Sequence, residues 1–301
     1  MKNHSQLCLK VADLSVRVSS CDPSLKLEAK GAIQDFLAGA DQPDTRVTAA
    51  WSDLSDVNLG SKVFDSSALW KLYRHNGWQV YSFTSSVLGP VPYKVASFNS
   101  TFTRGEISLH REYFEPEQPL YPLEYPLDEL WMVNVLSQGR GAEVHSCGLI
   151  DEQGEGHLFV GQSRAGKSTM ARLWQEKKTA QVLSDDRIVL RRSGRQLWMY
   201  GTPWHGEAGL SAATRAPLSG IYFLQHGPAN QLLPVSAAQA VGRLFACSFP
   251  TFHSPEGLDF MLGFLEEVVQ AVPCFDLRFL PDPEVIEFVL EGRSKSRGGT
   301  P

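Results

Sequence analysis

The sequence GQSRAGKST occupies residues 161–169 and decides the fold class of the second half of this chain. It fits the pattern G-x-x-x-x-G-K-[ST], known as the P-loop or Walker A motif, in which glycines let the backbone curl around phosphate oxygens. The apolar run LFV precedes it at 158–160, and the helix-favouring run MARLWQEKK follows it at 170–178. The sequence therefore predicts a strand, a phosphate-binding loop and a helix, in that order.

This loop carries the groups that a nucleoside triphosphate and its metal ion require. Backbone amides and the dipole of the following helix favour an anion. We expect Lys167 to neutralise the β and γ phosphates, Ser168 to offer its hydroxyl to Mg²⁺, and Thr169 to add a hydroxyl donor. The predicted cofactors are ATP and Mg²⁺, bound by Gly161, Gln162, Ser163, Arg164, Ala165, Gly166, Lys167, Ser168 and Thr169.

Two adjacent carboxylates, Asp185 and Asp186, follow the run QVLS, 18 residues beyond Lys167. Beside a site for Mg²⁺ and ATP, one carboxylate can hold the metal or its water while the other accepts the proton of an attacking hydroxyl. A solvated turn between two strands is the alternative. His145 lies upstream in the run EVHSCGLI, where a lone histidine is more often structural than catalytic.

The order of His145-x-x-Gly148, GQSRAGKST and LSDDRIVL resembles the catalytic domain of the HPr kinase/phosphorylase family, over roughly residues 143–190. The resemblance implies a carboxykinase-like P-loop domain of the α/β class with a mixed sheet, and it implies assembly into oligomers. It also implies that His145 lies near the transferred phosphoryl group, that Asp186 is the general base, and that Asp185 works with Ser168 around Mg²⁺. Lys167, Asp185, Asp186 and His145 are thus the expected catalytic residues.

The segment GTPWHGEAGLS at 201–211 combines turn residues with aromatic, imidazole and carboxylate groups, which is typical of functional loops. Glu207 is a candidate Mg²⁺ ligand, and His205 is a candidate substrate or phosphate contact. A tight structural turn explains the segment equally well.

Residues 7–114 alternate short apolar runs with turn residues, which predicts antiparallel strands. We expect a smaller, β-rich α+β domain over 1–127 that serves recognition or assembly, followed by the P-loop domain over 128–292. The polar sequence GRSKSRGGTP predicts a disordered tail over 293–301. Within the second domain, the sequence predicts a hairpin around DEQGEG, strands on either side of Ser193-Gly194, and a helix capped by Ser254 with Pro255 in its first turn.

Composition excludes several classes of protein. The formal net charge is −5, and no basic stripe is present, so we expect no nucleic-acid partner. The five cysteines are widely spaced and form no C-x-x-C pair, which favours a reducing compartment. We find no signal-peptide pattern and no run approaching the ~20 apolar residues of a membrane span, so we expect a cytoplasmic protein without a membrane partner.

These features together predict an ATP- and Mg²⁺-dependent kinase that transfers the γ phosphate to a hydroxyl group of a peptide, a protein or a small molecule. The protein-kinase motifs H-R-D and D-F-G are missing, as is the guanine motif N-K-x-D. Two alternatives stay open. One is a nucleotide-binding sensor or interaction module without catalysis, and the other is a phosphorylase or carboxykinase-like reaction that uses the same loop.

Overall fold

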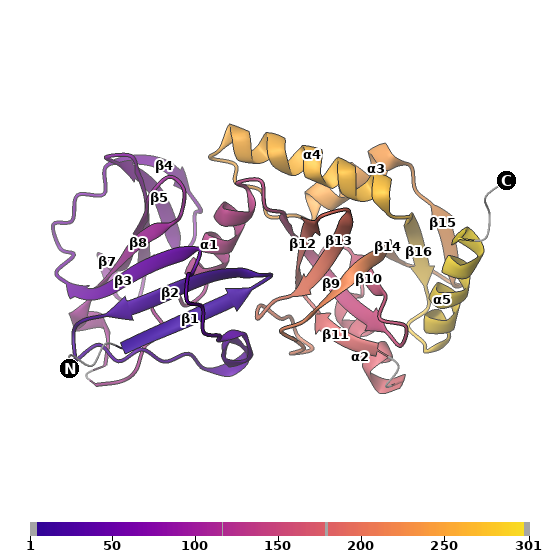
Figure 1. Ribbon diagram of the computed structural model, residues 1–301, viewed down its shortest axis with the longest axis horizontal. Helices are drawn as coiled ribbons and strands as arrows, with labels where there is room; N and C mark the ends of the chain where they lie inside the picture. The colour runs from indigo at the N-terminus through magenta and orange to yellow at the C-terminus, as the bar shows by residue number, and fades with distance from the viewer. Residues whose placement is uncertain (1–4, 116, 178–179, 298–301) are drawn as a thin grey trace. The chain divides into compact units, whose positions relative to one another are not determined.

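A computed structural model of the chain describes residues 5–115, 117–177 and 180–297. The chain divides into two compact units, Met1–Val135 and Leu136–Pro301 (Figure 1). Throughout these described ranges, none of the helices combines the length and the apolar character that a membrane span requires. The five cysteines are free thiols.

The first unit is built on a mixed sheet whose strands lie in the order β1-β2-β3-β8-β7-β6-β5-β4. Its strands are β1 (Ser5–Val11), β2 (Leu14–Ser20), β3 (Thr45–Ser52), β4 (Ser61–Asp65), β5 (Trp70–His75), β6 (Trp78–Ser85), β7 (Gly89–Phe98) and β8 (Arg104–His110). Strand β3 pairs in parallel with both β2 and β8, so the prediction of wholly antiparallel strands is wrong. The physical reason is the long connection over 21–44, because a parallel pair needs such a crossover.

Short helical segments complete this unit. They are the 3-10 helices η1 (Gly31–Phe36) and η2 (Arg111–Tyr113), and the helix α1 (Leu127–Leu136). The indole of Trp131 is fully buried and donates a hydrogen bond of 2.9 Å to the hydroxyl of Thr45. This bond attaches α1 to the start of β3.

The second unit is of the α/β class and also holds a mixed sheet. Its strands are β9 (Ala142–Asp151), β10 (Gly156–Val160), β11 (Ala180–Ser184), β12 (Arg187–Ser193), β13 (Gln196–Gly201), β14 (Arg215–His226), β15 (Gln231–Pro234) and β16 (Cys274–Phe279). Strand β14 runs parallel to β10 and β16, whereas the hairpins β9–β10 and β12–β13 are antiparallel. The first pair confirms the hairpin predicted around DEQGEG, and the second confirms the strands predicted on either side of Ser193-Gly194. The pairings β9–β12, β12–β13, β13–β14, β14–β10 and β10–β9 close into a circuit.

Helices cover both faces of this sheet (Figure 1). One face packs against α3 (Ala237–Ala246) and α4 (Pro255–Ala271), and the other packs against α2 (Lys167–Lys177) and α5 (Glu284–Arg297). Neighbouring residues of β14 serve opposite faces, as strand geometry requires: Ile221 lies in the α3/α4 core and Tyr222 in the α2/α5 core.

Helix α4 begins as the sequence predicts. Pro255 occupies its first turn, and the hydroxyl of Ser254 accepts a hydrogen bond of 3.1 Å from the amide of Gly257. The end of the chain differs from the prediction, because α5 continues to Arg297 and residues 293–297 are therefore helical. The segment EGRSKSR contains glutamate, arginine and lysine, which extend a helix that has already formed. The rest of the predicted tail, 298–301, lies outside the described residues.

Candidate functional site

The loop over 161–166 curls tightly between the buried strand β10 and helix α2. A Cβ atom on Gly161 would lie 2.5 Å from the Cβ atom of Ala165, so the two ends of the curl approach each other closely. Gly166 has φ of +104°, and a Cβ atom there would lie 2.6 Å from the ring of Phe279. Both glycines of the motif are therefore required by the shape of the loop.

Helix α2 presents the amides of its first turn to this loop. The first helical hydrogen bond runs from the amide of Met170 to the carbonyl of Gly166, at 2.9 Å. The amides of Lys167, Ser168 and Thr169 precede that bond, as is usual at a helix start, and such amides are suited to binding an anion.

Two residues that sequence reasoning missed, His226 and Phe279, pack against the loop. His226, at the end of β14, places its Nε2 atom 3.2 Å from the carbonyl oxygen of Arg164. Its ring also lies against Phe279, with ring centroids 5.5 Å apart. Arg164 itself has φ of +68°, so its backbone is held in the left-handed region. The side chains of Gln162, Ser163 and Arg164 are exposed.

Lys167 folds back across the loop. Its side-chain amine donates hydrogen bonds to the carbonyls of Gly161 at 2.9 Å and Gln162 at 3.1 Å. Burial lowers the pKa of Lys167, and the nearby charge of Asp186 acts in the opposite direction. The ammonium group is thus held at the loop, beside an acidic residue that the sequence also predicts to be functional.

Asp185 is completely buried, and its carboxylate organises the segment that follows Trp204. Oδ1 accepts a hydrogen bond of 2.9 Å from the amide of Gly206, and Oδ2 accepts one of 2.9 Å from the amide of Ala208. The hydroxyl of Ser168 lies 3.3 Å from the same Oδ2 atom. The structure therefore brings Ser168 and Asp185 together, and it shows that Asp185 also fixes a loop.

Asp186 is held by two basic groups. Nε2 of His145 lies 2.8 Å from Oδ1, and the guanidinium of Arg187 bonds Oδ2. Burial raises the pKa of Asp186, but the hydrogen bond from His145 and the charges of Arg187 and Lys167 outweigh it, so the pKa lies below its usual value. The carboxylate is consequently ionised at neutral pH.

Strand pairing explains how His145 reaches Asp186. His145 lies opposite Arg187 in the β9–β12 register, and its amide donates to the carbonyl of Cys247 at 2.6 Å. The amide of Ser146 donates to the carbonyl of Asp186 at 3.0 Å. The histidine and the acidic pair are therefore fixed to each other by backbone bonds.

Arg187 is a further member of this cluster that sequence reasoning missed. Its guanidinium lies 4.4 Å above the ring of Phe249, and its Nε atom lies 3.7 Å from a carboxylate oxygen of the buried Glu143. The only signal in the sequence is its position directly after the acidic pair. Its stacking partner is distant in sequence, so no local pattern predicts it.

Glu207 lies between the two residues whose amides bind Asp185, with its side chain exposed. Among the described residues, its carboxylate forms no hydrogen bond or ion pair with Ser168 or Asp185, and no group of three or more His, Cys, Asp or Glu side chains is arranged to hold a metal ion. His205 is also exposed, with Nδ1 3.2 Å from the carbonyl of Gly206. The structure thus brings together Lys167, Ser168, Asp185, Asp186 and His145, while the exposed side chain of Glu207 lies outside this cluster.

Comparison with known proteins finds matches among solved structures. Neither a family model nor a curated protein matches this chain. Among solved structures, the chain is similar to the HPr(Ser) kinase/phosphatase from Coxiella burnetii, with 14% sequence identity and a TM-score of 0.32. The match covers 52% of this chain and 99% of that chain. A likeness at this level is weak.

Proposed function

We propose that this chain is a kinase that binds ATP and Mg²⁺ at 161–169 and transfers the γ phosphate to a hydroxyl group of a peptide, protein or small-molecule acceptor. The observation that carries this proposal is the convergence of four groups at the start of α2. The side-chain amine of Lys167 bonds the loop, and the hydroxyl of Ser168 lies 3.3 Å from Oδ2 of Asp185. Asp186 lies close enough to Lys167 for its charge to raise the pKa of that lysine against the effect of burial. We assign the carboxykinase-like P-loop domain to residues 128–292 and a recognition or assembly role to 1–127.

The residues of the site suit a polyphosphate. The curl that requires glycine at 161 and 166 and the amides at the start of α2 provide donors without side-chain obstruction. Lys167 now bonds two loop carbonyls, which are weak partners compared with a phosphate anion. It would therefore exchange them for the β and γ phosphates.

The residues also suit Mg²⁺, because a hydroxyl and a carboxylate oxygen are the ligand types that this ion prefers. Ser168 would bind the ion, with Asp185 beside it. Both oxygens of Asp185 already accept backbone amides, so Asp185 would act mainly by orienting Ser168 and the ion's water. When bound, ATP would supply the phosphoryl group and Mg²⁺ would neutralise the charge that develops on it.

Asp186 is the group that would accept a hydrogen bond from the hydroxyl of the phosphate acceptor. A carboxylate offers about four lone-pair sites, and His145 and Arg187 use two of them, which leaves room for one more donor. A carboxylate with a lowered pKa is a weak base. Phosphoryl transfer through a loose transition state demands little early deprotonation, so Asp186 would orient the hydroxyl first and take its proton late.

The test is nucleotide-dependent stabilisation. Free Mg·ATP at 100 times its Kd should stabilise the wild-type protein by about 2.7 kcal/mol, and this should raise the midpoint of thermal unfolding by on the order of 5 °C. Lys167→Ala should abolish the shift. The matched control is Lys177→Ala, which removes a lysine at the far end of the same helix, where it pairs with Glu287, and should keep the shift. Equal shifts in the wild type and Lys167→Ala would refute the proposal.

A further inference from the structure

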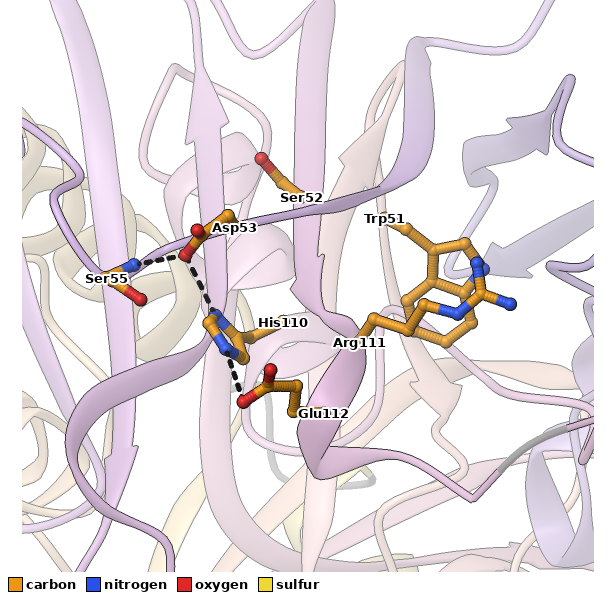
Figure 2. Close-up of a pocket in the computed structure, with 7 residues that line it drawn as sticks. All are labelled: Trp51, Ser52, Asp53, Ser55, His110, Arg111 and Glu112. Atoms are coloured by element: carbon orange, nitrogen blue, oxygen red, sulfur yellow. Dashed lines mark hydrogen bonds and ion pairs between the residues drawn. The ribbon is translucent and has the colours of Figure 1, made fainter.

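The first unit has a hollow of about 450 Å³ where two parallel strands end side by side (Figure 2). Ser52 ends β3 and pairs with His110, which ends β8. After Ser52 the polypeptide enters the loop that begins at Asp53, and after His110 it enters η2. Diverging connections at the carboxyl ends of parallel strands leave a crevice, which is a common place for ligands.

Backbone and side-chain bonds hold the groups of this hollow in place. His110 is 5% exposed, and the amide of Leu54 donates to its Nδ1 atom at 2.9 Å. Nδ1 is therefore an acceptor, so the imidazole carries its proton on Nε2. The amide of Ser55 donates to Oδ1 of Asp53 at 2.9 Å, and the indole of Trp51 donates to the hydroxyl of Ser24 at 3.1 Å. Groups held in this way lose little freedom when a ligand binds.

Two carboxylates flank His110, as Figure 2 shows. Asp53 lies 4.0 Å from Nδ1 and Glu112 lies 3.8 Å from Nε2, distances too long for hydrogen bonds. Their side chains are 82% and 86% exposed, so both can accept bonds from a ligand. Hydrogen bonds from Ser55 lower the pKa of Asp53, which keeps it ionised at neutral pH.

The positive charge of this hollow lies apart from the two carboxylates. Arg111 stacks over Trp51, with the guanidinium carbon 5.8 Å from the ring centroid (Figure 2). The space beside His110 is therefore negative, while the space beside Trp51 offers an apolar face and a guanidinium donor. An ammonium or guanidinium group fits the first, and an alkyl chain with peptide carbonyls fits the second.

We propose that this hollow binds a lysine or arginine side chain of a peptide segment, with the cationic group beside the exposed carboxylates of Asp53 and Glu112. A metal ion fits less well, because Nδ1 of His110 is already bonded to Leu54. An inorganic anion would face two carboxylates. A bare ammonium ion would leave most of the volume empty, since pockets for small organic ligands begin at about 300 Å³.

Binding is tested by ¹⁵N NMR of the full chain labelled at tryptophan, with the indole signal of Trp51 assigned from Trp51→Phe. The probes are acetyl-Ala-Lys-Ala-amide, the same peptide with norleucine in place of lysine, and butylamine. We expect the lysine peptide to shift the Trp51 signal saturably, with a Kd at least tenfold lower than that of either other probe. Asp53→Asn combined with Glu112→Gln should raise the Kd at least tenfold.

The matched control is Asp56→Asn, which removes an exposed carboxylate from the same loop but outside the hollow, and should leave the Kd unchanged. All three changes are at exposed positions, and an unchanged unfolding midpoint checks that folding is intact. Equal shifts with the lysine and norleucine peptides, butylamine binding as tightly as the peptide, or full binding by the double variant would each overturn the proposal. No nucleotide and no residue of 161–169 enters this experiment, so its outcome is separate from that of Lys167→Ala.

Discussion

Nε2 of His145 lies 2.8 Å from Oδ1 of Asp186, and this contact joins strand β9 to the acidic pair that precedes β12. Arg187 holds the other oxygen of the same carboxylate. Burial of Asp186 favours its protonated form, and these two basic groups with Lys167 reverse that effect. The charge state of Asp186 therefore depends on a residue 41 positions away in the chain.

Replacing His145 with alanine should raise the pKa of Asp186, because burial would remain while its principal hydrogen bond is lost. The carboxyl ¹³C signal of Asp186, followed against pH, measures this change. Arg187→Met should shift the pKa in the same direction, since it removes a neighbouring positive charge. An unchanged Asp186 titration in both variants would show that the two contacts do not control its charge.

The same pair makes stability depend on pH. The pKa of Asp186 is lower in the folded protein than the unfolded value of 3.8. Its stabilising contribution is therefore complete above that value and is lost as the pH falls through the lowered folded pKa. Urea unfolding at pH 7 should show Asp186→Asn to be less stable than the wild type, and this difference should shrink as the pH falls below 3.8. A difference that stays constant would contradict the assignment.

Asp186→Asn should separate catalysis from nucleotide binding. The kinase proposal expects release of phosphate from ATP, with water replacing the natural acceptor, to fall about 10²- to 10⁴-fold, as is typical when a positioned base is removed. The thermal shift with Mg·ATP should persist, because Lys167 and the loop are intact. A nucleotide-binding sensor needs neither a base nor hydrolysis, so the absence of phosphate release from the wild type, together with retained biological activity in Asp186→Asn, would favour that alternative.

Asp185→Asn should loosen the loop over 206–210. Asparagine replaces one carboxylate oxygen with an NH₂ donor, so one of the amides of Gly206 and Ala208 loses its acceptor in a buried place and the other faces a neutral oxygen, which together should cost about 3 kcal/mol of unfolding free energy. Hydrogen exchange of those two amides should accelerate. Asp186→Asn is the matched control, because Asp186 bonds neither amide; equal acceleration in both variants would rule out a specific role for Asp185.

Gly166→Ala should disturb the phosphate-binding loop more than an ordinary glycine substitution. The new Cβ atom would meet Phe279 at 2.6 Å in addition to the strain of a φ of +104°. Gly154→Ala is the control, since Gly154 has φ of +79° with no neighbouring atom within 4 Å. We expect a loss of about 1 kcal/mol for Gly154→Ala, a larger loss for Gly166→Ala, and loss of the Mg·ATP thermal shift only in Gly166→Ala. Similar losses in stability and retained shifts would argue against the tight curl.

Sequence alone determined the features that depend on neighbouring residues. The P-loop motif, the hairpin β9–β10, the strands β12 and β13, and the cap of α4 at Ser254 all follow from contiguous patterns. The adjacency of Asp185 and Asp186 and their spacing from Lys167 are also visible in the chain. Backbone conformation in turns, caps and loops is set locally by glycine, proline and short polar side chains, so such features can be predicted.

Only the tertiary structure decided which distant residues meet. Strand β3 pairs in parallel with β2 and β8, and Arg187 stacks on Phe249. His226 and Phe279 pack against the phosphate-binding loop, and amides of the segment after Trp204 donate to Asp185. It also placed Trp51 and His110 in one hollow. Strand order and register are chosen by the burial of whole sheet faces and by the pairing of buried polar groups. These energies belong to contacts between remote segments, and no local sequence pattern carries them.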